Sequence, residues 1–204
     1  MRAPVKICGL TDPGDAAFCA EAGAAALGAV FYPPSPRNVS PERAAEVFVG
    51  IPADVHRVGV FVDADAGTIL RTARVAGLTA AQLHGSEPPE LAAELAAEGL
   101  AVVKVLRGGD LLAAARRYPD GTRFLVECGR GVLPGGNGAA WDWSKARVLL
   151  PRAFGIAGGL SPANIAEAAA ASGAAFFDLS SAVESSPGRK DPEKVRAFLA
   201  AVPR

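Results

Sequence analysis

The chain has 204 residues, and half of them are apolar, so it can bury one substantial core and we expect one domain over residues 1–204. Lysine plus arginine number 21, and aspartate plus glutamate also number 21. This balance leaves no broad electrostatic field to hold a polyanion or an acidic lipid surface, so we expect neither a nucleic-acid partner nor a membrane.

The cysteines and the apolar runs indicate the compartment. Cys8, Cys19 and Cys128 are odd in number and lack CxxC spacing, which suits a reducing cytosol and predicts no disulfide framework. The first residues lack the apolar stretch of a secretory signal, and other apolar runs are broken well short of the roughly 20 residues that span a bilayer. We therefore expect a cytoplasmic protein.

Short β-prone runs alternate with alanine-rich segments that carry charges at helical spacing, a pattern typical of repeated βα units around a parallel sheet. The predicted strands are residues 5–7, 26–31, 58–62, 80–83, 102–106, 124–126, 154–157 and 176–179. The predicted helices are residues 15–22, 41–49, 64–76, 88–98, 110–118, 143–149, 162–170 and 192–201. Three of these helices begin with a proline that a polar residue precedes, at Ser40-Pro41, Ser161-Pro162 and Asp191-Pro192, where we expect the polar side chain to cap the helix.

Eight strand–helix pairs in one chain of this length predict an α/β fold, a single parallel (β/α)₈ (TIM) barrel. The main alternative is an open doubly wound sheet, whose usual sign is GxGxxG after the first strand. Here the first strand is followed by Cys8-Gly9-Leu10-Thr11, which contains one glycine. The closed barrel is therefore the expected fold.

The longest connection spans residues 129–141 and contains Gly135-Gly136-Asn137-Gly138. Such a glycine run would give a loop hinge freedom, which is consistent with a lid over a site. A surface loop without a role explains the composition equally well.

In a barrel of this type the active site lies at the C-terminal ends of the strands. Cys8 follows the first strand, where its thiol could act as a base or nucleophile, or could simply be a small buried apolar group. Glu127 ends a buried strand, where a carboxylate is costly unless solvated, paired or used, so it is either a general acid or the partner of an arginine such as Arg107 or Arg130. Asp178, on the eighth strand, has the same alternatives and could also cap a helix.

Glycines and serines follow the last two strands, where barrels commonly bind phosphate through backbone amides. Gly158 and Gly159 allow close backbone approach, while Ser180 and Ser181 add hydroxyl donors. We expect a phosphate site here, and the alternative is that these are ordinary turn residues.

Two further side chains are candidates for ligand binding. Arg37 follows a proline-rich segment that limits the entropy lost on binding an anion, although a plain surface arginine is the alternative. His84 and His56 are the only histidines, so a histidine-rich zinc site is excluded and no metal is required. His84 could also be satisfied by its strand neighbours.

Several motifs, taken together and in order, resemble phosphoribosylanthranilate isomerase over nearly the whole chain. They are Lys6-Ile7-Cys8-Gly9-Leu10-Thr11, Phe31-Tyr32-Pro33-Pro34-Ser35-Pro36-Arg37, Gln82-Leu83-His84-Gly85, Gly135-Gly136-Asn137-Gly138 with Trp141-Asp142-Trp143, Ala157-Gly158-Gly159-Leu160, and Ser180-Ser181-Ala182-Val183-Glu184-Ser185-Ser186-Pro187-Gly188.

The resemblance implies a (β/α)₈ barrel that catalyses an Amadori rearrangement in tryptophan biosynthesis, without metal or organic cofactor, on a small phosphosugar. A monomer or a homodimer is expected. By resemblance, Cys8 is the general base that removes the sugar C2 proton, and the carboxylate that ends the sixth strand, Glu127, is the general acid. The pocket and phosphate residues implied in the same way are Arg37, suited to the anthranilate carboxylate, His84, Asp178, Gly158, Gly159, Ser180 and Ser181.

Three positions depart from the family pattern. Glu127 replaces an aspartate, and its extra methylene moves the carboxyl out by about 1 Å, a displacement that can cost on the order of 100-fold in rate. Ala182 replaces a glycine and would be strained if its φ were positive, and Ala139 stands where a basic residue is common. The alternatives are therefore an isomerase of a related phosphoribosyl amine and a non-catalytic phosphosugar-binding barrel.

Overall fold

The computed structural model describes residues 2–128 and 141–203, and its eight main strands form a closed barrel. The strands are β1 (Val5–Ile7), β2 (Ala26–Phe31), β3 (His56–Phe61), β4 (Ala80–Leu83), β5 (Ala101–Arg107), β6 (Arg123–Glu127), β7 (Phe154–Ala157) and β8 (Phe176–Leu179). Neighbours in the chain pair in parallel throughout, and β8 pairs with β1 to close the ring. The predicted closed barrel is confirmed, and the open sheet is excluded.

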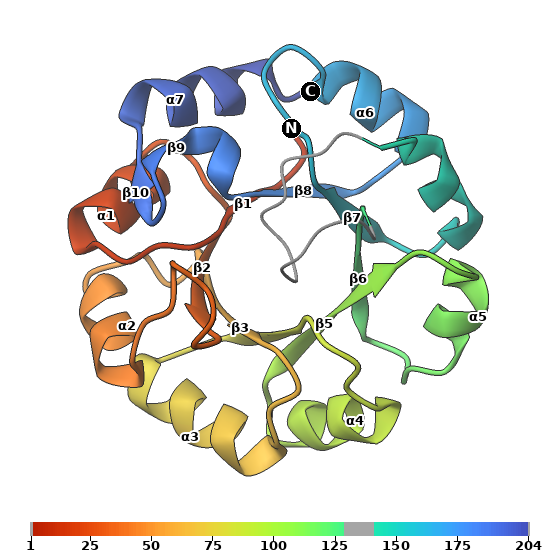
Figure 1. The fold of residues 1–204 in the computed structure, drawn as a ribbon, viewed down its shortest axis with the longest axis horizontal. Helices are drawn as coiled ribbons and strands as arrows, with labels where there is room; N and C mark the ends of the chain where they lie inside the picture. Colours follow the sequence, from red (N-terminus) through yellow and green to blue (C-terminus); the bar gives the residue numbers. More distant parts are fainter. Residues whose placement is uncertain (1, 129–140, 204) are drawn as a thin grey trace.

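Helices surround the barrel on its outer face (Figure 1). They are α1 (Pro13–Glu21), α2 (Pro41–Val47), α3 (Ala66–Ala76), α4 (Pro89–Ala97), α5 (Leu111–Arg116), the 3₁₀ helix η1 (Trp143–Leu149), α6 (Ile165–Ser172) and α7 (Pro192–Ala201). Three elements after β8 were not predicted: the 3₁₀ helix η2 (Ser181–Val183) and a hairpin of β9 (Glu184–Ser186) with β10 (Arg189–Lys190).

Two of the three predicted helix caps are confirmed. The Ser40 and Asp191 side chains accept backbone N–H groups at the starts of α2 and α7. The predicted cap at Ser161 is wrong, because Asn164 occupies the N-cap position of α6. The Asn164 side chain accepts the Ser161 N–H at 2.7 Å and donates to the Gly159 carbonyl at 2.8 Å, which holds this segment in a turn and delays the helix.

Side-chain alternation explains why polar groups reach the inside of the barrel. Val105 and Leu125 form a small buried cluster that also packs against Phe176 and is separate from the larger core. Residues two apart on a strand face the same side. Glu127 and Asp178 therefore share the inner face with Leu125 and Phe176 and stand nearer the C-terminal ends of their strands.

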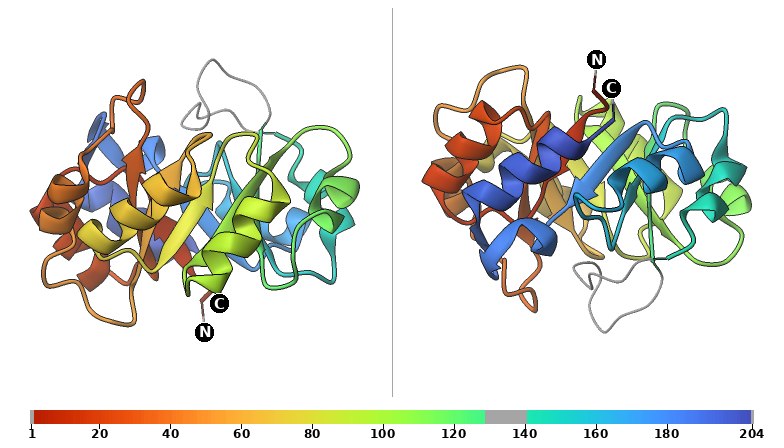
Figure 2. Two further views of the ribbon diagram at one scale, coloured as in Figure 1. Left: turned by 90° about the horizontal axis from the view of Figure 1, so that it is seen from below. Right: turned by 90° about the horizontal axis from the view of Figure 1, so that it is seen from above.

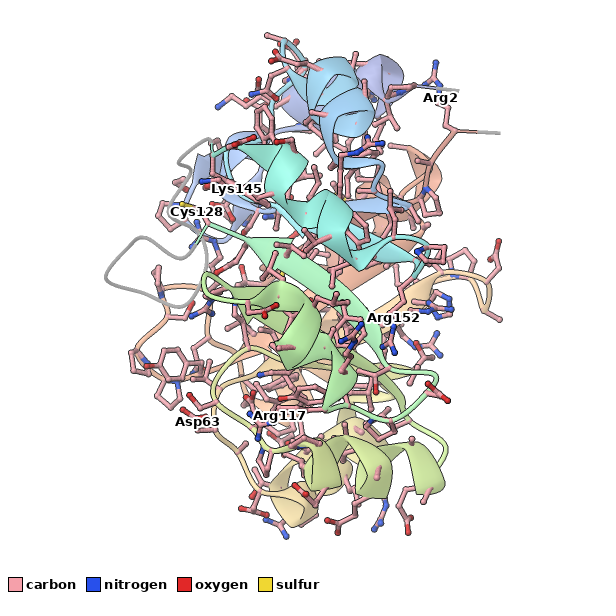
Figure 3. The ribbon with its side chains drawn as sticks, turned by 90° about the vertical axis from the view of Figure 1, so that its right-hand side faces the viewer. Arg2, Asp63, Arg117, Cys128, Lys145 and Arg152 are labelled. Atoms are coloured by element: carbon pink, nitrogen blue, oxygen red, sulfur yellow. The ribbon has the colours of Figure 1, made fainter. Side chains whose placement is uncertain are left out.

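The two ends of the barrel differ in what they carry. Figure 2 shows the chain termini together at one end and the connection from β2 to α2 projecting from the other. In Figure 3, Cys128 and Asp63 lie at one end, whereas Arg2 and Arg152, which precede β1 and β7, lie toward the opposite one. Cys128 and Asp63 follow β6 and β3, so the strand C-termini gather at the end where barrels place their active sites. In the described part of the chain, no helix has the length and apolarity needed to cross a lipid bilayer.

Candidate active site

A cavity of about 320 Å³ opens at the C-terminal ends of the strands. Its lining includes eight of the nine site residues predicted from the sequence: Cys8, His84, Glu127, Gly158, Gly159, Asp178, Ser180 and Ser181. The ninth, Arg37, does not line it. The strand ends of β1, β4, β6, β7 and β8 therefore converge on one space, as expected for a barrel site.

Cys8 leaves β1 at a sharp turn. The next residue, Gly9, has φ +77°, a left-handed conformation that favours glycine, and a Cβ on it would collide with the side chain of Arg37. Cys8 is only 9% exposed yet contributes to the cavity wall. The thiol is therefore both buried and in contact with the cavity.

An ion pair lies directly beside this thiol. Lys6 on β1 and Asp178 on β8 are register partners, and Lys6 Nζ donates to both carboxylate oxygens at 3.0 Å. Cys8 Sγ and Lys6 Cε both lie within 3.0 Å of the point that a Cβ on Gly28 would occupy. Burial raises the pKa of the Cys8 thiol, and the Lys6 ammonium offsets only part of that effect. The partner of Asp178 is thus Lys6 and not a helix N-terminus.

Glu127 is held by two nitrogen-bearing side chains. Its Oε1 lies 2.8 Å from Arg107 Nε and 3.2 Å from His84 Nε2. Burial raises the pKa of Glu127, but the nearby His84 and Arg107 outweigh burial, so the pKa lies below its ordinary value. The arginine pairing that the sequence left open is therefore present, with Arg107, and the carboxyl still faces the cavity.

Two buried polar atoms at the cavity lack a well-aligned hydrogen-bond partner within the described chain: Gln82 Oε1 and His84 Nε2. Gln82 Nε2 lies 3.3 Å from His84 Nδ1, so the two side chains form a connected pair. Because buried polar groups are normally satisfied, these atoms are positioned to meet a ligand. Sequence reasoning omitted Gln82 from the site, although a glutamine inside the apolar strand β4 was the available signal.

Arg37 is engaged beside the cavity. Its Nε and Nη2 donate to the two oxygens of Glu184 at 2.8 and 2.5 Å. Glu184 also accepts from Lys190 Nζ at 2.8 Å. Burial raises the pKa of Glu184, but these two cations outweigh burial and lower it. Sequence reasoning named neither Glu184 nor Lys190 as a site residue, because their importance depends on a hairpin that it did not predict.

The loops after β7 and β8 have the backbone that the phosphate interpretation requires. Gly158 and Gly159 have φ of +87° and +68°, a region that other residues rarely adopt. Ser180 Oγ donates to the Cys8 carbonyl at 3.0 Å. Ala182 lies in η2, and Asp63 is the one non-glycine residue of the described chain with positive φ, so the condition for strain at Ala182, a positive φ, is not met.

Some predictions lie outside the described residues: the possible lid and its glycine run, Arg130 as a partner of Glu127, and the departure at Ala139. Within residues 2–128 and 141–203, no three His, Cys, Asp or Glu side chains are grouped as a metal-ligand set. The two carboxylates that line the cavity are paired with cations, Glu127 with Arg107 and Asp178 with Lys6.

The chain is similar to proteins of one activity along its whole length. The family model described as N-(5'phosphoribosyl)anthranilate (PRA) isomerase matches residues 5–201. The N-(5'-phosphoribosyl)anthranilate isomerase of Paramagnetospirillum magneticum is 47% identical over 212 residues, which cover 98% of this chain and 97% of the relative. The protein of that name from Rubrobacter xylanophilus is 43% identical, with 98% of each chain covered.

Solved structures agree with these sequences. The phosphoribosyl anthranilate isomerase of Thermus thermophilus superposes with a TM-score of 0.86 at 37% identity and 97% coverage of both chains. A phosphoribosyl anthranilate isomerase in complex with reduced 1-(o-carboxyphenylamino)-1-deoxyribulose 5-phosphate gives a TM-score of 0.84 at 36% identity, covering 98% of this chain and 97% of that one. The fold, the cavity and these likenesses together show that the chain belongs to the N-(5'-phosphoribosyl)anthranilate isomerase family.

Proposed function

We propose that Cys8 and Glu127 are the general base and the general acid with which this isomerase converts phosphoribosylanthranilate into 1-(2-carboxyphenylamino)-1-deoxyribulose 5-phosphate. The observation that carries this assignment is the cavity itself. Cys8 from β1 and Glu127 from β6 line the same space, and β7 and β8, which carry the proposed phosphate loops, lie between them. A sugar phosphate anchored at these loops would have a proton-transfer group on each side.

The rearrangement is an internal redox reaction, in which the sugar C1 is reduced and C2 is oxidised. Proton transfer from Glu127 to the ring oxygen breaks the C1–O bond, while the nitrogen lone pair forms a C=N⁺ bond to C1. The Cys8 thiolate then takes the C2 proton, and the C–H electrons form a C1=C2 bond as the iminium nitrogen is neutralised. Protonation at C1 and loss of the C2 hydroxyl proton yield the ketone. No external electron acceptor enters this balance.

Binding is assigned to the remaining site residues. The backbone amides of Gly158 and Gly159, together with Ser180 and Ser181, would hold the phosphate, because amides at left-handed glycines can approach an anion closely. With Nε and Nη2 of Arg37 engaged by Glu184, Nη1 is the nitrogen left for the anthranilate carboxylate.

His84 and Asp178 complete the proposed pocket. The buried Nε2 of His84 is available to a substrate oxygen or to the carboxyl of Glu127. Asp178 would act through its pairing with Lys6, which fixes the carboxylate against the cavity wall next to Cys8.

The test is a comparison of the wild-type chain, Cys8→Ser, Glu127→Asp and Glu127→Gln with phosphoribosylanthranilate, followed by loss of anthranilate-type fluorescence. Removing the thiol, or removing the ionisable carboxyl, should each abolish most turnover, while Glu127→Asp retains it. Absence of turnover by the folded wild-type chain would reject the assignment. Poor turnover that Glu127→Asp fails to restore would point to a related phosphoribosyl amine, and binding without any turnover to a non-catalytic barrel. The relatives favour neither of these alternatives.

We also propose a compartment, a domain organisation and an oligomeric state for this protein. We place the chain in the cytoplasm, as one barrel domain over residues 1–204 that acts as a monomer or a homodimer. Three free cysteines suit a reducing compartment. One similar solved structure is of monomers generated from the dimeric phosphoribosylanthranilate isomerase of Thermotoga maritima. Light scattering on the purified chain decides between the two states.

A further inference from the structure

Both backbone polar groups of Cys8 are bonded to the end of β8 or to the segment that follows it. Its N–H donates to the Leu179 carbonyl at 2.8 Å. Its carbonyl accepts from Lys190 Nζ at 2.6 Å and from Ser180 Oγ at 3.0 Å. The peptide that carries the thiol is therefore attached to the same loop that carries the proposed phosphate ligands.

Lys190 lies at the centre of this attachment. It comes from β10, its side chain is 1% exposed, and its ammonium contacts the Cys8 carbonyl, Glu184 Oε1 at 2.8 Å and the Ser180 carbonyl at 3.5 Å. Glu184 is shared with Arg37, so one carboxylate faces two cations in a buried cluster. Burial lowers the pKa of Lys190, and Glu184 offsets only part of that effect.

Such an arrangement is not explained by stability alone. Buried ion pairs contribute little net stability compared with apolar packing, because both charges lose their hydration. A turn can satisfy one carbonyl with a backbone N–H or a serine hydroxyl, and Ser180 already does so for Cys8. The additional buried ammonium, directed at the peptide of the proposed base, therefore calls for a functional reason.

We propose that Lys190 is a positioning residue for Cys8: its buried ammonium, bonded to the Cys8 carbonyl, fixes the Cys8 peptide relative to the phosphate loop. This inference deepens the proposed function and rests on Cys8 being the general base. The sulfur and the phosphate ligands then move as one unit, so the distance from the bound phosphate to the base stays constant. The buried positive charge of Lys190 also lowers the pKa of the Cys8 thiol, against the larger raising effect of burial.

The test measures the thiol as well as the reaction. Cys8 is alkylated with iodoacetamide across a range of pH, and the modified peptide is quantified by mass spectrometry, which separates it from Cys19 and Cys128. In Lys190→Met, the alkylation midpoint should move to higher pH, because a positive charge that lowers the pKa of the thiol is lost while the other charges near it, Lys6, Asp178 and Arg37, are unchanged. The same variant should lose on the order of 10- to 100-fold in kcat, with a much smaller change in KM.

Lys194→Met is the matched control. Lys194 Nζ donates to the backbone carbonyl of Glu184 at 2.7 Å, but the Lys194 side chain is half-exposed and does not reach Cys8. Its alkylation midpoint and kcat should equal those of the wild type. If Lys190→Met fails to fold, Lys190→Gln provides the measurement, since it keeps a donor for the Cys8 carbonyl but removes the charge, and it should still raise the midpoint.

A wild-type midpoint in a folded Lys190 variant would overturn the inference. So would a rise of equal size in Lys194→Met. Failure of the proposed function looks different: wild-type protein would then turn over no phosphoribosylanthranilate, while the alkylation midpoints would still report whether Lys190 acts on the Cys8 thiol.

Discussion

The ammonium of Lys6 and the carboxylate of Asp178 form a buried two-point contact across the seam where β8 closes onto β1, with both oxygens 3.0 Å from Nζ. Both side chains are less than a tenth exposed. Lys6→Met would leave the aspartate charge buried without its partner, which costs about 3–5 kcal/mol of folding free energy. We expect urea unfolding to show a loss of this order.

The double variant Lys6→Met with Asp178→Leu separates pairing from packing. Removing both charges leaves no unpaired buried group, so the double variant should be more stable than either single variant. Purely additive losses would mean that the pair is not energetically coupled. Activity should be lost in all three variants, because Asp178 and Lys6 border the thiol of Cys8.

The acid role of Glu127 predicts a graded response at that position. Glu127→Gln keeps the side-chain shape but removes the transferable proton, and we expect kcat to fall by about 10²- to 10⁴-fold. Glu127→Asp keeps the proton and withdraws the carboxyl by about 1 Å, so its loss should be clearly smaller than that of Glu127→Gln and no more than roughly 100-fold. Steady-state rates decide this, with the exposed Glu94→Gln as control. Equal rates for the Gln and Asp variants would remove Glu127 from the proton transfer.

The pKa shifts of the two proposed catalytic groups run against their roles. Glu127 must be protonated, but its neighbours lower its pKa, and Cys8 must be ionised, but burial raises its pKa. Only the small fraction of free enzyme in which Glu127 is protonated and Cys8 is ionised is then active. In a plot of kcat/KM against pH, the group with the lower pKa, Glu127, sets the acid limb.

Removing Arg107 should move that acid limb. Arg107→Met deletes a positive charge 2.8 Å from Glu127 Oε1, so the pKa of the carboxyl rises and the limb shifts to higher pH. Arg117→Met, which changes an exposed arginine at the C-terminal end of α5, should leave the profile in place. A shift to lower pH, or no shift, would mean that the limb belongs to another group.

The sequence predicted the barrel well because its signals are local. Each βα unit has its own apolar run and its own helix start, and the bounds of β1, β2, β4, β7, β8 and α7 agree with the structure. The error at Ser161 has the same origin: a serine followed by proline is a cap signal, but the Asn164 side chain, three residues on, satisfies the turn instead.

The parts of the site that were missed depend on contacts between distant segments. Lys6 and Asp178 are 172 positions apart, and Lys190 reaches a carbonyl 182 positions away. No local pattern encodes which carboxylate a buried lysine meets. The sequence could indicate such residues only through their types, as with Gln82 inside an apolar strand.

The alanine at position 182 should be neutral for catalysis. Its backbone is not left-handed, so Ala182→Gly relieves no strain and instead adds freedom to the unfolded chain, which costs about 0.4–1 kcal/mol. We expect a small loss in thermal stability and an unchanged KM. A clear fall in KM would show that the Ala182 methyl group obstructs the substrate.

Gly28 on β2 leaves the space that the Cys8 side chain occupies. A Cβ on Gly28 would stand 2.9 Å from Cys8 Sγ, 3.0 Å from Lys6 Cε and 3.2 Å from Cys8 Cα, and the last of these is backbone that cannot rotate away. Gly28→Ala should therefore displace the sulfur and lower kcat by on the order of 100-fold, with a stability loss of about 1–3 kcal/mol from overpacking. Gly14→Ala, near the start of α1, is the control and should keep wild-type kcat, because its Cβ would meet only the Asp12 side chain and neither residue lines the cavity. Wild-type kcat in a folded Gly28→Ala variant would mean that the Cys8 thiol can move without loss of catalysis, which would contradict its role as the base.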